Sequence, residues 1–564
     1  MSKVVLKATD DLRQIIIEAI GKAIAQGELP SEAIPDFSIE VPAEKSHGDF
    51  ASNIAMVSAK AFRMPPRKIA EIITSFIDLS GTLFNKFEIA GPGFINFFFG
   101  EKFYCDVLED IQQMGDKYGH SDYGQGKKVM VEFVSANPTG PMHMGNARGG
   151  ALGDCLAAVL DAAGYNVWRE FYINDAGNQI DKFGMSLDIR YQQIFKGEDQ
   201  VELPEDSYHG EDIKDLAELF AKEHGDSFLQ KSEEERRKAL VDFALPRNIE
   251  KMKQDMKKYR IEFDEWFHES VLHNDGEITD TIQILKDRGL TYEKEGALWY
   301  KATLFGSEKD EVLVRQNGNP TYFAADIAYH RNKFYVRGFD TCIDIWGADH
   351  HGHVARVKGA MDAIGLDGSK LDVVLMQLVK LVRNGEIVRM SKRTGKAIQL
   401  SDLLDEVPVD AARFIFNMRE SNSQMDFDLD LAVQQDSQNP VYYVQYAHAR
   451  ICSILKTLDN DGIKARKCTQ EELALLTAPE ELDLIRHLGD YTNQIISSAK
   501  DYDPTKITRY AITLATLFHK FYNSCHVKGN DESLTQARLC LCLCVRTVIR
   551  NVLSMLKITA PETM

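Results

Sequence analysis

The sequence predicts a multidomain α/β protein in which an N-terminal α+β domain and a C-terminal all-α helical bundle flank a central domain built on a parallel sheet. Three observations lead to this fold class. The chain has 564 residues, and a single hydrophobic core stops growing well below that length. Between residues 128 and 173 a strand, a turn, a helix and a second strand follow one another, which is the order of a βαβ unit. From about Asn439 to the end, apolar residues recur at helical spacing.

The two ends of the chain form separate domains in this prediction. Residues 1–115 combine a helix from about Asp10 to Gln26 with a hairpin around Gly91-Pro92-Gly93, and we assign them to the N-terminal α+β domain. This domain shows no residues at catalytic spacing. Residues 439–564 are nearly all helical in pattern and form a bundle of ordinary domain size.

Residues 116–438 have the features of a Rossmann-like nucleotide-binding domain with insertions. A strand over 129–134 is followed by Asn137-Pro138, which cannot continue a strand or a helix. A helix from about His143 to Ala163 and a strand from Asn166 to Ile173 complete the βαβ unit. The other expected elements are an acidic helical insertion near 190–260, a hairpin of 312–315 with 320–325 around Asn317-Gly318, and buried strands at 341–346 and 372–379.

The composition is that of a folded protein with unevenly distributed charge. Hydrophobic residues make up 44% and charged residues 27% of the chain, which excludes a largely disordered protein. The net charge of −19, taken alone, argues against a nucleic-acid partner. However, residues 198–235 hold 14 carboxylates against three lysines, and the region from Val441 onward has a net charge of +2. We therefore expect a solvated acidic insertion, and contact with a polyanion only at local cationic faces.

The same bulk features favour a cytoplasmic location. The first residues lack the apolar core of a signal peptide, and no run approaches the roughly 20 apolar residues that cross a bilayer. The nine cysteines never form a C-x-x-C pair, so the sequence indicates neither a disulfide framework nor a zinc ribbon. We expect no membrane partner and no tightly bound structural metal.

Three polar clusters predict nucleotide chemistry. The first, His143-Met144-Gly145-Asn146, opens the predicted helix, where unpaired N–H groups and the positive end of the helix dipole suit phosphates. The second, residues 389–396, places four cations in eight residues, as a lid over polyphosphate would. The third, residues 346–353, follows a buried strand, and its Asp349 is suited to accept hydrogen bonds from ribose hydroxyls. The competing interpretations are a capped helix with an incidental histidine, an exposed basic turn, and a metal site at Asp349 with three nearby histidines.

Glu132 stands out because it lies in an otherwise apolar strand. A carboxylate in a buried strand is costly unless a cation pairs with it. A cationic substrate would supply that partner, and an internal Arg or Lys would do so equally well. The residues alone leave both possibilities open, and Asn137, Tyr322 and Asp326 are the dispersed polar residues that would share a site with Glu132.

Taken in order, these segments resemble the class I aminoacyl-tRNA synthetases, and within that class the arginyl-tRNA synthetases of bacterial type. One such motif would be weak, whereas a collinear set along the whole chain is specific. The segments that carry the resemblance are 48–53, 91–96, 132–149, 172–179, 322–330, 389–393 and 439–450.

The resemblance implies a two-step ligase that is usually monomeric and that generally needs tRNA for the first step. L-Arginine and ATP with Mg²⁺ give arginyl-adenylate and pyrophosphate, and the arginyl group then passes to the terminal ribose of tRNA(Arg). By motif position, the implied catalytic residues are His143, Asn146, Arg389 and Lys392. The implied ATP contacts are His143, Gly145, Asn146, Gly347, Asp349, His350, Met390, Ser391 and Lys392. The implied arginine contacts are Glu132, Ser135, Asn137, His143, Tyr322, Asp326 and His350, and the implied tRNA contacts are Tyr442, Gln445, Tyr446 and Arg450.

Two positions depart from the family pattern. Asn146 stands where the first signature usually has His, and Asn donates a hydrogen bond but cannot act as a cation or a general acid. Arg389 replaces the usual Lys at the start of the basic segment, which keeps the charge and changes its geometry.

Other functions compete with this one. The nearest alternative is a class I synthetase that is specific for another amino acid. The absence of an evident editing insertion and the paired carboxylates, which suit a guanidinium, favour arginine. A small-molecule adenylyltransferase shares the His-x-Gly-x helix mouth but does not need a helical C-terminal bundle. A catalytically silent RNA-binding scaffold would not need intact phosphate-binding clusters.

Overall fold

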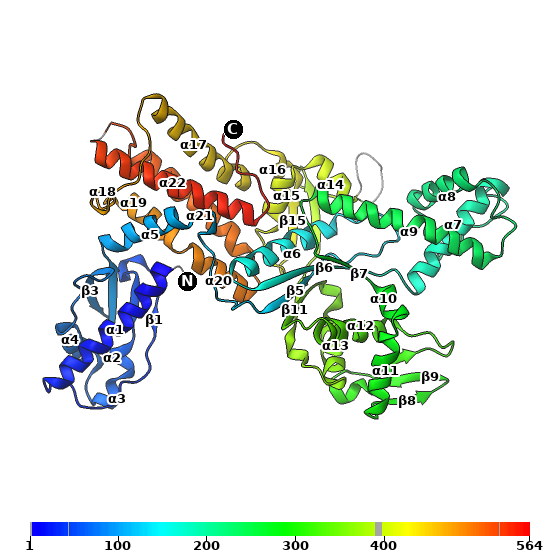
Figure 1. Cartoon of the computed structure of the whole chain (residues 1–564), viewed down its shortest axis with the longest axis horizontal. Helices are drawn as coiled ribbons and strands as arrows, with labels where there is room; N and C mark the ends of the chain where they lie inside the picture. The colour runs from blue at the N-terminus through cyan, green and yellow to red at the C-terminus, as the bar shows by residue number, and fades with distance from the viewer. Residues whose placement is uncertain (1–2, 43, 390–397, 530) are drawn as a thin grey trace.

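The computed structural model describes residues 3–42, 44–389, 398–529 and 531–564. In Figure 1 the N-terminal domain lies at one end of the molecule, the C-terminal helices lie beside it, and the central sheet occupies the middle. Two lobes project from the sheet on the side away from the N-terminal domain, one of them purely helical.

The N-terminal domain packs helices against a four-stranded antiparallel sheet of order β1-β2-β4-β3. The expected hairpin is present as β3 (Phe84–Ala90) and β4 (Phe94–Phe99). The first helix, α1 (Lys3–Ala25), begins before the expected Asp10, because Val5 and Ala8 continue its buried face. The other elements are β1 (Ile39–Glu40), β2 (Phe50–Ser52), α2 (Ile54–Val57), α3 (Ala59–Phe62), α4 (Pro66–Ser75) and α5 (Glu101–Met114).

The central domain is built on a five-stranded sheet, all parallel, which confirms the expected α/β class. In spatial order its strands are β12 (Leu371–Met376), β11 (Thr341–Gly347), β5 (Lys128–Glu132), β6 (Asn166–Ile173) and β7 (Glu265–His268). The crossover helix α6 (Gly145–Ala162) lies close to the end of β5. Gly153 permits this approach, since a Cβ at that position would collide with the Phe133 side chain. The helix begins after the expected His143, which instead pairs with Gln399 in an isolated bridge.

The purely helical lobe contains α7 (Asn178–Lys196), α8 (Glu211–His224) and α9 (Glu233–Lys258). It has a small core of its own around Phe183, Tyr191 and Phe220. The acidic segment 198–235 belongs to this lobe, which projects away from the sheet in Figure 1.

The second lobe corrects one sequence-based expectation. Residues 320–325 do not form the second strand of a hairpin, because the helix α12 (Tyr322–Arg331) begins there. The Thr321 side chain accepts the N–H of Ala324 and so caps this helix. The remaining elements of the lobe are α10 (Glu269–Asn274), α11 (Glu277–Asp287), β8 (Thr291–Lys294), β9 (Ala297–Tyr300), β10 (Glu311–Val314) and α13 (His351–Ala363).

A small three-stranded sheet of order β14-β13-β15 lies between the central sheet and the C-terminal helices in the chain. Its strands and neighbouring helices are β13 (Val379–Arg383), β14 (Glu386–Val388), α14 (Leu400–Glu406), α15 (Val409–Phe416), β15 (Met425–Asp428) and α16 (Leu429–Val433). The expected all-α bundle follows as α17 (Pro440–Asn460), α18 (Gln470–Leu473), α19 (Pro479–Gly489), α20 (Tyr491–Asp501), α21 (Thr505–Ser524) and α22 (Glu532–Met555). No helix in the described part of the chain is long and apolar enough to span a membrane.

Candidate active site

The carboxyl edge of the parallel sheet brings several of the expected site residues together. Glu132 ends β5, and Gly347 ends the neighbouring strand β11. The Ser135 hydroxyl donates to Glu132 Oε1 at 2.8 Å and accepts the N–H of Tyr172, on β6, at 3.2 Å. Asn137 lies exposed in the same connection after β5. Ligands of open parallel sheets bind at this edge, so the arrangement suits a nucleotide and its co-substrate.

His143 lies exposed at the mouth of α6 in a defined orientation. The N–H of Gly145 donates to His143 Nδ1 at 3.1 Å, so the neutral ring carries its proton on Nε2. Asn146 lies half-buried in the first turn of the same helix. The helix mouth therefore offers an imidazole N–H and an amide N–H, both suited to phosphate oxygens.

Of the basic segment 389–396, only Arg389 lies among the described residues. Arg389 is exposed just after β14, whereas Met390, Ser391 and Lys392 lie outside the described residues. On the downstream side, the Ile398 carbonyl accepts the N–H of Met144 at 3.0 Å. At Ile398 the chain therefore lies directly beside the mouth of α6.

Glu132 has an internal cation as its partner, which was one of the two possibilities left open by the sequence. Lys333, whose side chain is fully buried, donates from Nζ to Glu132 Oε2 at 2.6 Å and to both oxygens of Asp344. Burial raises the pKa of Glu132, opposed by the Lys333 charge. For Asp344, burial acts in the raising direction, but Lys333 and His330 outweigh it and lower the pKa. A substrate cation is therefore not needed to neutralise Glu132.

Tyr322 and Asp326 lie one turn apart on α12, so both side chains lie on the same helix face. Asp326 Oδ2 is 2.9 Å from His353 Nε2, and the Tyr322 ring lies 6.0 Å from the ring of the same histidine. Asp326 remains partly exposed, and Tyr322 is 60% exposed. This face offers a carboxylate beside an aromatic ring, a combination that suits a guanidinium.

Glu269 is a second carboxylate near this face, and sequence reasoning missed it. It is buried, and its Oε2 accepts the Tyr172 hydroxyl at 2.8 Å. Burial raises the pKa of Glu269, and the charge of Asp326 raises it further. Its partner Tyr172 belongs to segment 172–179, which carries part of the family resemblance. No residue pattern in the sequence distinguishes Glu269 itself from any other acidic residue that follows a strand.

The third polar cluster separates into two parts. Asp349 and His350 lie exposed in the turn after β11, with 3.6 Å between Asp349 Oδ2 and His350 Nε2. His353 lies in α13 and is paired with Asp326 instead. Within the described ranges, no group of three or more His, Cys, Asp or Glu side chains is placed to hold a metal ion.

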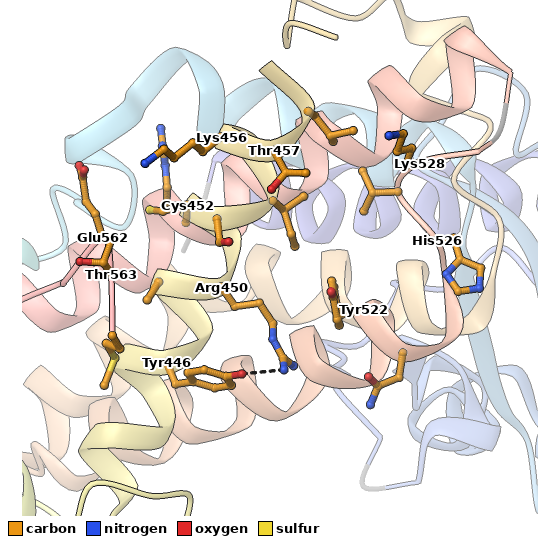
Figure 2. A pocket seen from close by; sticks show the side chains of 18 residues that line it. Tyr446, Arg450, Cys452, Lys456, Thr457, Tyr522, His526, Lys528, Glu562 and Thr563 are labelled. Carbon is orange, nitrogen blue, oxygen red and sulfur yellow. Dashed lines mark hydrogen bonds between the residues drawn. The ribbon is translucent and has the colours of Figure 1, made fainter. Parts of the chain in front are cut away.

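A groove of about 1020 Å³ runs along α17 and is lined by two of the expected tRNA-contacting residues. The Arg450 guanidinium donates to the Tyr446 hydroxyl at 2.8 Å and lies over the rings of Tyr446 and Tyr522, each centroid 4.7 Å away. Figure 2 shows these side chains together with Lys456 and Lys528 around the groove. Cations interleaved with aromatic rings are typical of surfaces that bind single-stranded nucleic acid.

The other two expected residues on α17 differ from this pair. Gln445 is buried, and its amide donates to Asp410 Oδ2 and to the Thr559 carbonyl, each at 2.9 Å. Its side chain is committed to a contact between α15 and the C-terminal segment. Tyr442 lies half-buried near the start of the helix.

Three family models match consecutive parts of the chain. The arginyl tRNA synthetase N terminal domain matches residues 10–99, the catalytic domain of tRNA synthetases class I (R) matches 108–452, and the DALR anticodon binding domain matches 444–564.

Individual relatives match over the whole length. The arginine–tRNA ligase of Ruminiclostridium cellulolyticum is 58% identical over 553 residues, which cover 98% of each chain. The arginine–tRNA ligase of Acetivibrio thermocellus is 56% identical over 564 residues and covers both chains completely. Among solved structures, the arginyl-tRNA synthetase of Thermus thermophilus aligns with a TM-score of 0.71 and 21% identity over 98% of this chain and 100% of that one, which shows a shared fold.

Proposed function

Because this chain belongs to the arginyl-tRNA synthetases of class I, we propose that it activates L-arginine with ATP and transfers the arginyl group to tRNA(Arg). One observation carries the proposal: phosphate donors and carboxylates lie together at the carboxyl edge of the central parallel sheet. Phosphate donors lie at the mouth of α6, and carboxylates suited to a guanidinium lie on α12 and α10.

In the first step the arginine carboxylate attacks the α-phosphorus of ATP, taken as its Mg²⁺ complex, and pyrophosphate leaves. His143 Nε2–H and the Asn146 amide donate to phosphate oxygens, while Arg389 and Lys392 neutralise the departing pyrophosphate. An Asn side chain cannot supply a proton as a general acid, so Asn146 acts by hydrogen bonding alone. We propose that the helix mouth stabilises the transition state electrostatically, with no covalent bond to the protein.

The side chain of the substrate is proposed to bind at α12. Asp326 accepts the guanidinium, and Tyr322 lies against it. The closeness of Glu269 supports this pocket, because a guanidinium would relieve the repulsion between the two carboxylates.

The amino-acid end of the substrate is proposed to lie toward the end of β5. Ser135 and Asn137 hold it on the phosphate side of the pocket. Glu132 contributes there as an acceptor whose charge Lys333 already balances, so most of the selectivity for a cationic side chain falls to Asp326.

The adenosine end of ATP is proposed to lie over the end of β11. Gly347 has no Cβ that would collide with the Asp349 side chain. Asp349 is exposed and able to accept hydrogen bonds from ribose hydroxyls. His350 lies exposed beside it and would contact both the adenylate and the arginine end of the intermediate. Met390 and Ser391 belong to the basic segment and are proposed to contact the nucleotide from there.

In the second step a hydroxyl of the terminal ribose attacks the arginyl carbonyl, and AMP leaves. The tRNA body is proposed to contact Tyr446 and Arg450 in the groove along α17, with Tyr442 at its border, whereas the interior bonds of Gln445 support the helix instead. We further propose that the protein acts as a cytoplasmic monomer.

One experiment tests the function directly. ATP–pyrophosphate exchange is measured with L-arginine in the presence and absence of tRNA(Arg), and with other amino acids as controls. We expect exchange with arginine alone among the amino acids, and only when tRNA is present. Exchange with a different amino acid would reassign the specificity, and exchange with a small non-amino-acid acid would support an adenylyltransferase. A chain that gives no exchange under any condition would not be a synthetase.

A further inference from the structure

Arg148 is a fully buried arginine on the helix that carries the phosphate donors. It lies in the first turns of α6, and its exposed fraction is 0%. Among the described residues no carboxylate pairs with it, and its Nε has no hydrogen-bond partner. A buried guanidinium stays charged, so Arg148 is a buried cation with no carboxylate partner in the described ranges.

The hydrogen-bond partners of Arg148 within residues 3–42, 44–389, 398–529 and 531–564 are backbone carbonyls. Nη1 donates to the Gln377 carbonyl at 2.8 Å and to the Ser423 carbonyl at 3.0 Å, and Nη2 donates to the Glu420 carbonyl at 2.7 Å. Gln377 lies just before the start of β13, and Ser423 lies just before the start of β15. These two strands are parallel neighbours, so a single side chain joins α6 to the beginnings of both.

The strand that Arg148 holds leads directly to Arg389. β13 and β14 form an antiparallel hairpin, and Arg389 follows β14. On the other side of the basic segment, the Ile398 carbonyl accepts the N–H of Met144 at the mouth of α6. The residues on both sides of the basic segment are therefore connected to the start of α6, through Arg148 on one side and through Met144 on the other.

A purely structural role does not explain the choice of a cation here. Buried charge without a partner is costly, and a cation near a helix N-terminus opposes the helix dipole. Arg413 offers a comparison, because it is equally buried and also bonds to α6, yet it has the carboxylate of Asp154 as its partner. Arg148 has no such carboxylate among the described residues, and its guanidinium instead donates to three backbone carbonyls of the segments before β13 and β15.

We propose that Arg148 is a positioning residue for adenylate formation, which fixes the hairpin of β13 and β14, and with it Arg389, at the phosphate end of α6. This inference rests on the proposed activation of arginine. It assigns Arg148 no contact with substrate and no proton transfer. The position requires the planar guanidinium of an arginine, because two separate nitrogens, Nη1 and Nη2, bond three carbonyls of the segments that precede β13 and β15. The single ammonium nitrogen of a lysine cannot reproduce this geometry.

The test compares Arg148→Lys in the wild-type and in the Arg389→Ala background. In the wild-type background we expect kcat of pyrophosphate exchange to fall at least about tenfold, with KM for arginine within about threefold. In the Arg389→Ala background the same change should cost less than about twofold, because the group that Arg148 positions is already gone. Arg413→Lys is the matched control, and it should lower Tm while leaving kcat per folded molecule within about twofold of the wild type.

A second variant covers the case in which Arg148→Lys does not fold. Inserting Gly-Gly after Leu378 leaves Arg148 and its carbonyl partners in place but lengthens the link to β13, and it should reproduce the loss of kcat and its dependence on Arg389. Equal losses in both backgrounds, or unchanged kcat in the insertion variant, would overturn the proposal. A wild-type chain without arginine-dependent exchange would refute the proposed function itself, whereas normal wild-type exchange with unaffected variants would refute only the role of Arg148.

Discussion

Lys333 Nζ lies 2.6 Å from Glu132 Oε2 and 2.9 Å from Asp344 Oδ1, so one buried ammonium bridges the carboxylates of two neighbouring strands. Glu132 and Asp344 are paired across β5 and β11, and without a cation their charges would repel each other inside the sheet. Lys333 balances one of the two charges and distributes its hydrogen bonds over both. Glu132, which is proposed to lie at the amino-acid end of the substrate, thus belongs to an ionic network that already has its own cation.

Replacing Lys333 by Met should destabilise the protein strongly. The change leaves two buried carboxylates without their cation, and breaking a buried ion pair costs about 3–5 kcal/mol. The free energy of unfolding from urea titration at pH 7 measures the effect. Lys86→Met is the matched control, because Lys86 pairs with Glu88 on the surface and its loss should cost about 1 kcal/mol or less. A loss as small as that of the control would mean that Lys333 is not charged in the folded protein.

The need of Glu132 for a cation was predictable, but the identity of that cation was not. A carboxylate in an apolar strand signals a missing partner, yet Lys333 lies 201 positions further along the chain, and no local pattern connects the two. The same limit applies to Glu269, whose proximity to Asp326 depends on the packing of α10 against α12, two helices far apart in the sequence. The strand–turn–helix–strand order and the helical C-terminus were predictable, because both follow from the spacing of apolar residues within short stretches of the sequence.

Asp326→Asn should chiefly weaken arginine binding. The substitution keeps the size of the side chain and its contact with His353 but removes the charge that pairs with the guanidinium. A charge-assisted hydrogen bond contributes about 1.5–3 kcal/mol, so KM for arginine should rise on the order of 10- to 150-fold. The measurement is pyrophosphate exchange over a range of arginine concentrations at saturating ATP. Asp349→Asn serves as the control and should raise KM for ATP instead, and an unchanged arginine KM in Asp326→Asn would remove Asp326 from the pocket.

The helix α12 shows why one site residue, Tyr322, was placed on the wrong element. The Asn317-Gly318 turn and the preceding strand suggested a hairpin, and a bridge between Val314 and Pro320 does form across this turn. The pairing stops there because Thr321 caps a helix, and tertiary packing of its apolar face against the lobe decides the outcome. The helix brings Tyr322 and Asp326 within one turn of each other, whereas a strand would hold them about 13 Å apart along its axis.

His519 should make stability fall between pH 6.5 and pH 4. Burial, and then the charge of Arg450, lower the pKa of His519 from 6.5 to about 4. The unfolded chain therefore binds the proton first as the pH drops, so the stability that is fully present above pH 6.5 is lost progressively toward pH 4. Because the ring is only half-buried, we expect a loss of about 1–2 kcal/mol. Urea unfolding of the wild type and of His519→Gln at pH 7 and pH 4.5 isolates the effect, and equal pH dependence in both proteins would contradict it.

Arg450→Ala should weaken tRNA binding and reduce its salt dependence. If the guanidinium contacts one phosphate, the slope of log K against log salt should become smaller by about 0.7–0.9. Affinities measured by filter binding at several salt concentrations give this slope. Gln445→Ala is the matched control on the same helix, since its amide bonds inside the protein, and it should lower Tm with an unchanged slope. A normal slope in Arg450→Ala would place the tRNA elsewhere.

Lys392→Ala should separate catalysis from tRNA binding. Lys392 is proposed to neutralise charge that develops on the departing pyrophosphate, an interaction that strengthens in the transition state, so its loss should lower kcat of activation by about 10²–10³-fold. The affinity for tRNA should change less than about twofold, because the flanking Ile398 lies at the mouth of α6 rather than at the groove along α17. Single-turnover formation of arginyl-adenylate and filter binding of tRNA(Arg), measured on the same preparation, distinguish the two effects. Equal losses in rate and in tRNA affinity would mean that the basic segment binds tRNA and not pyrophosphate.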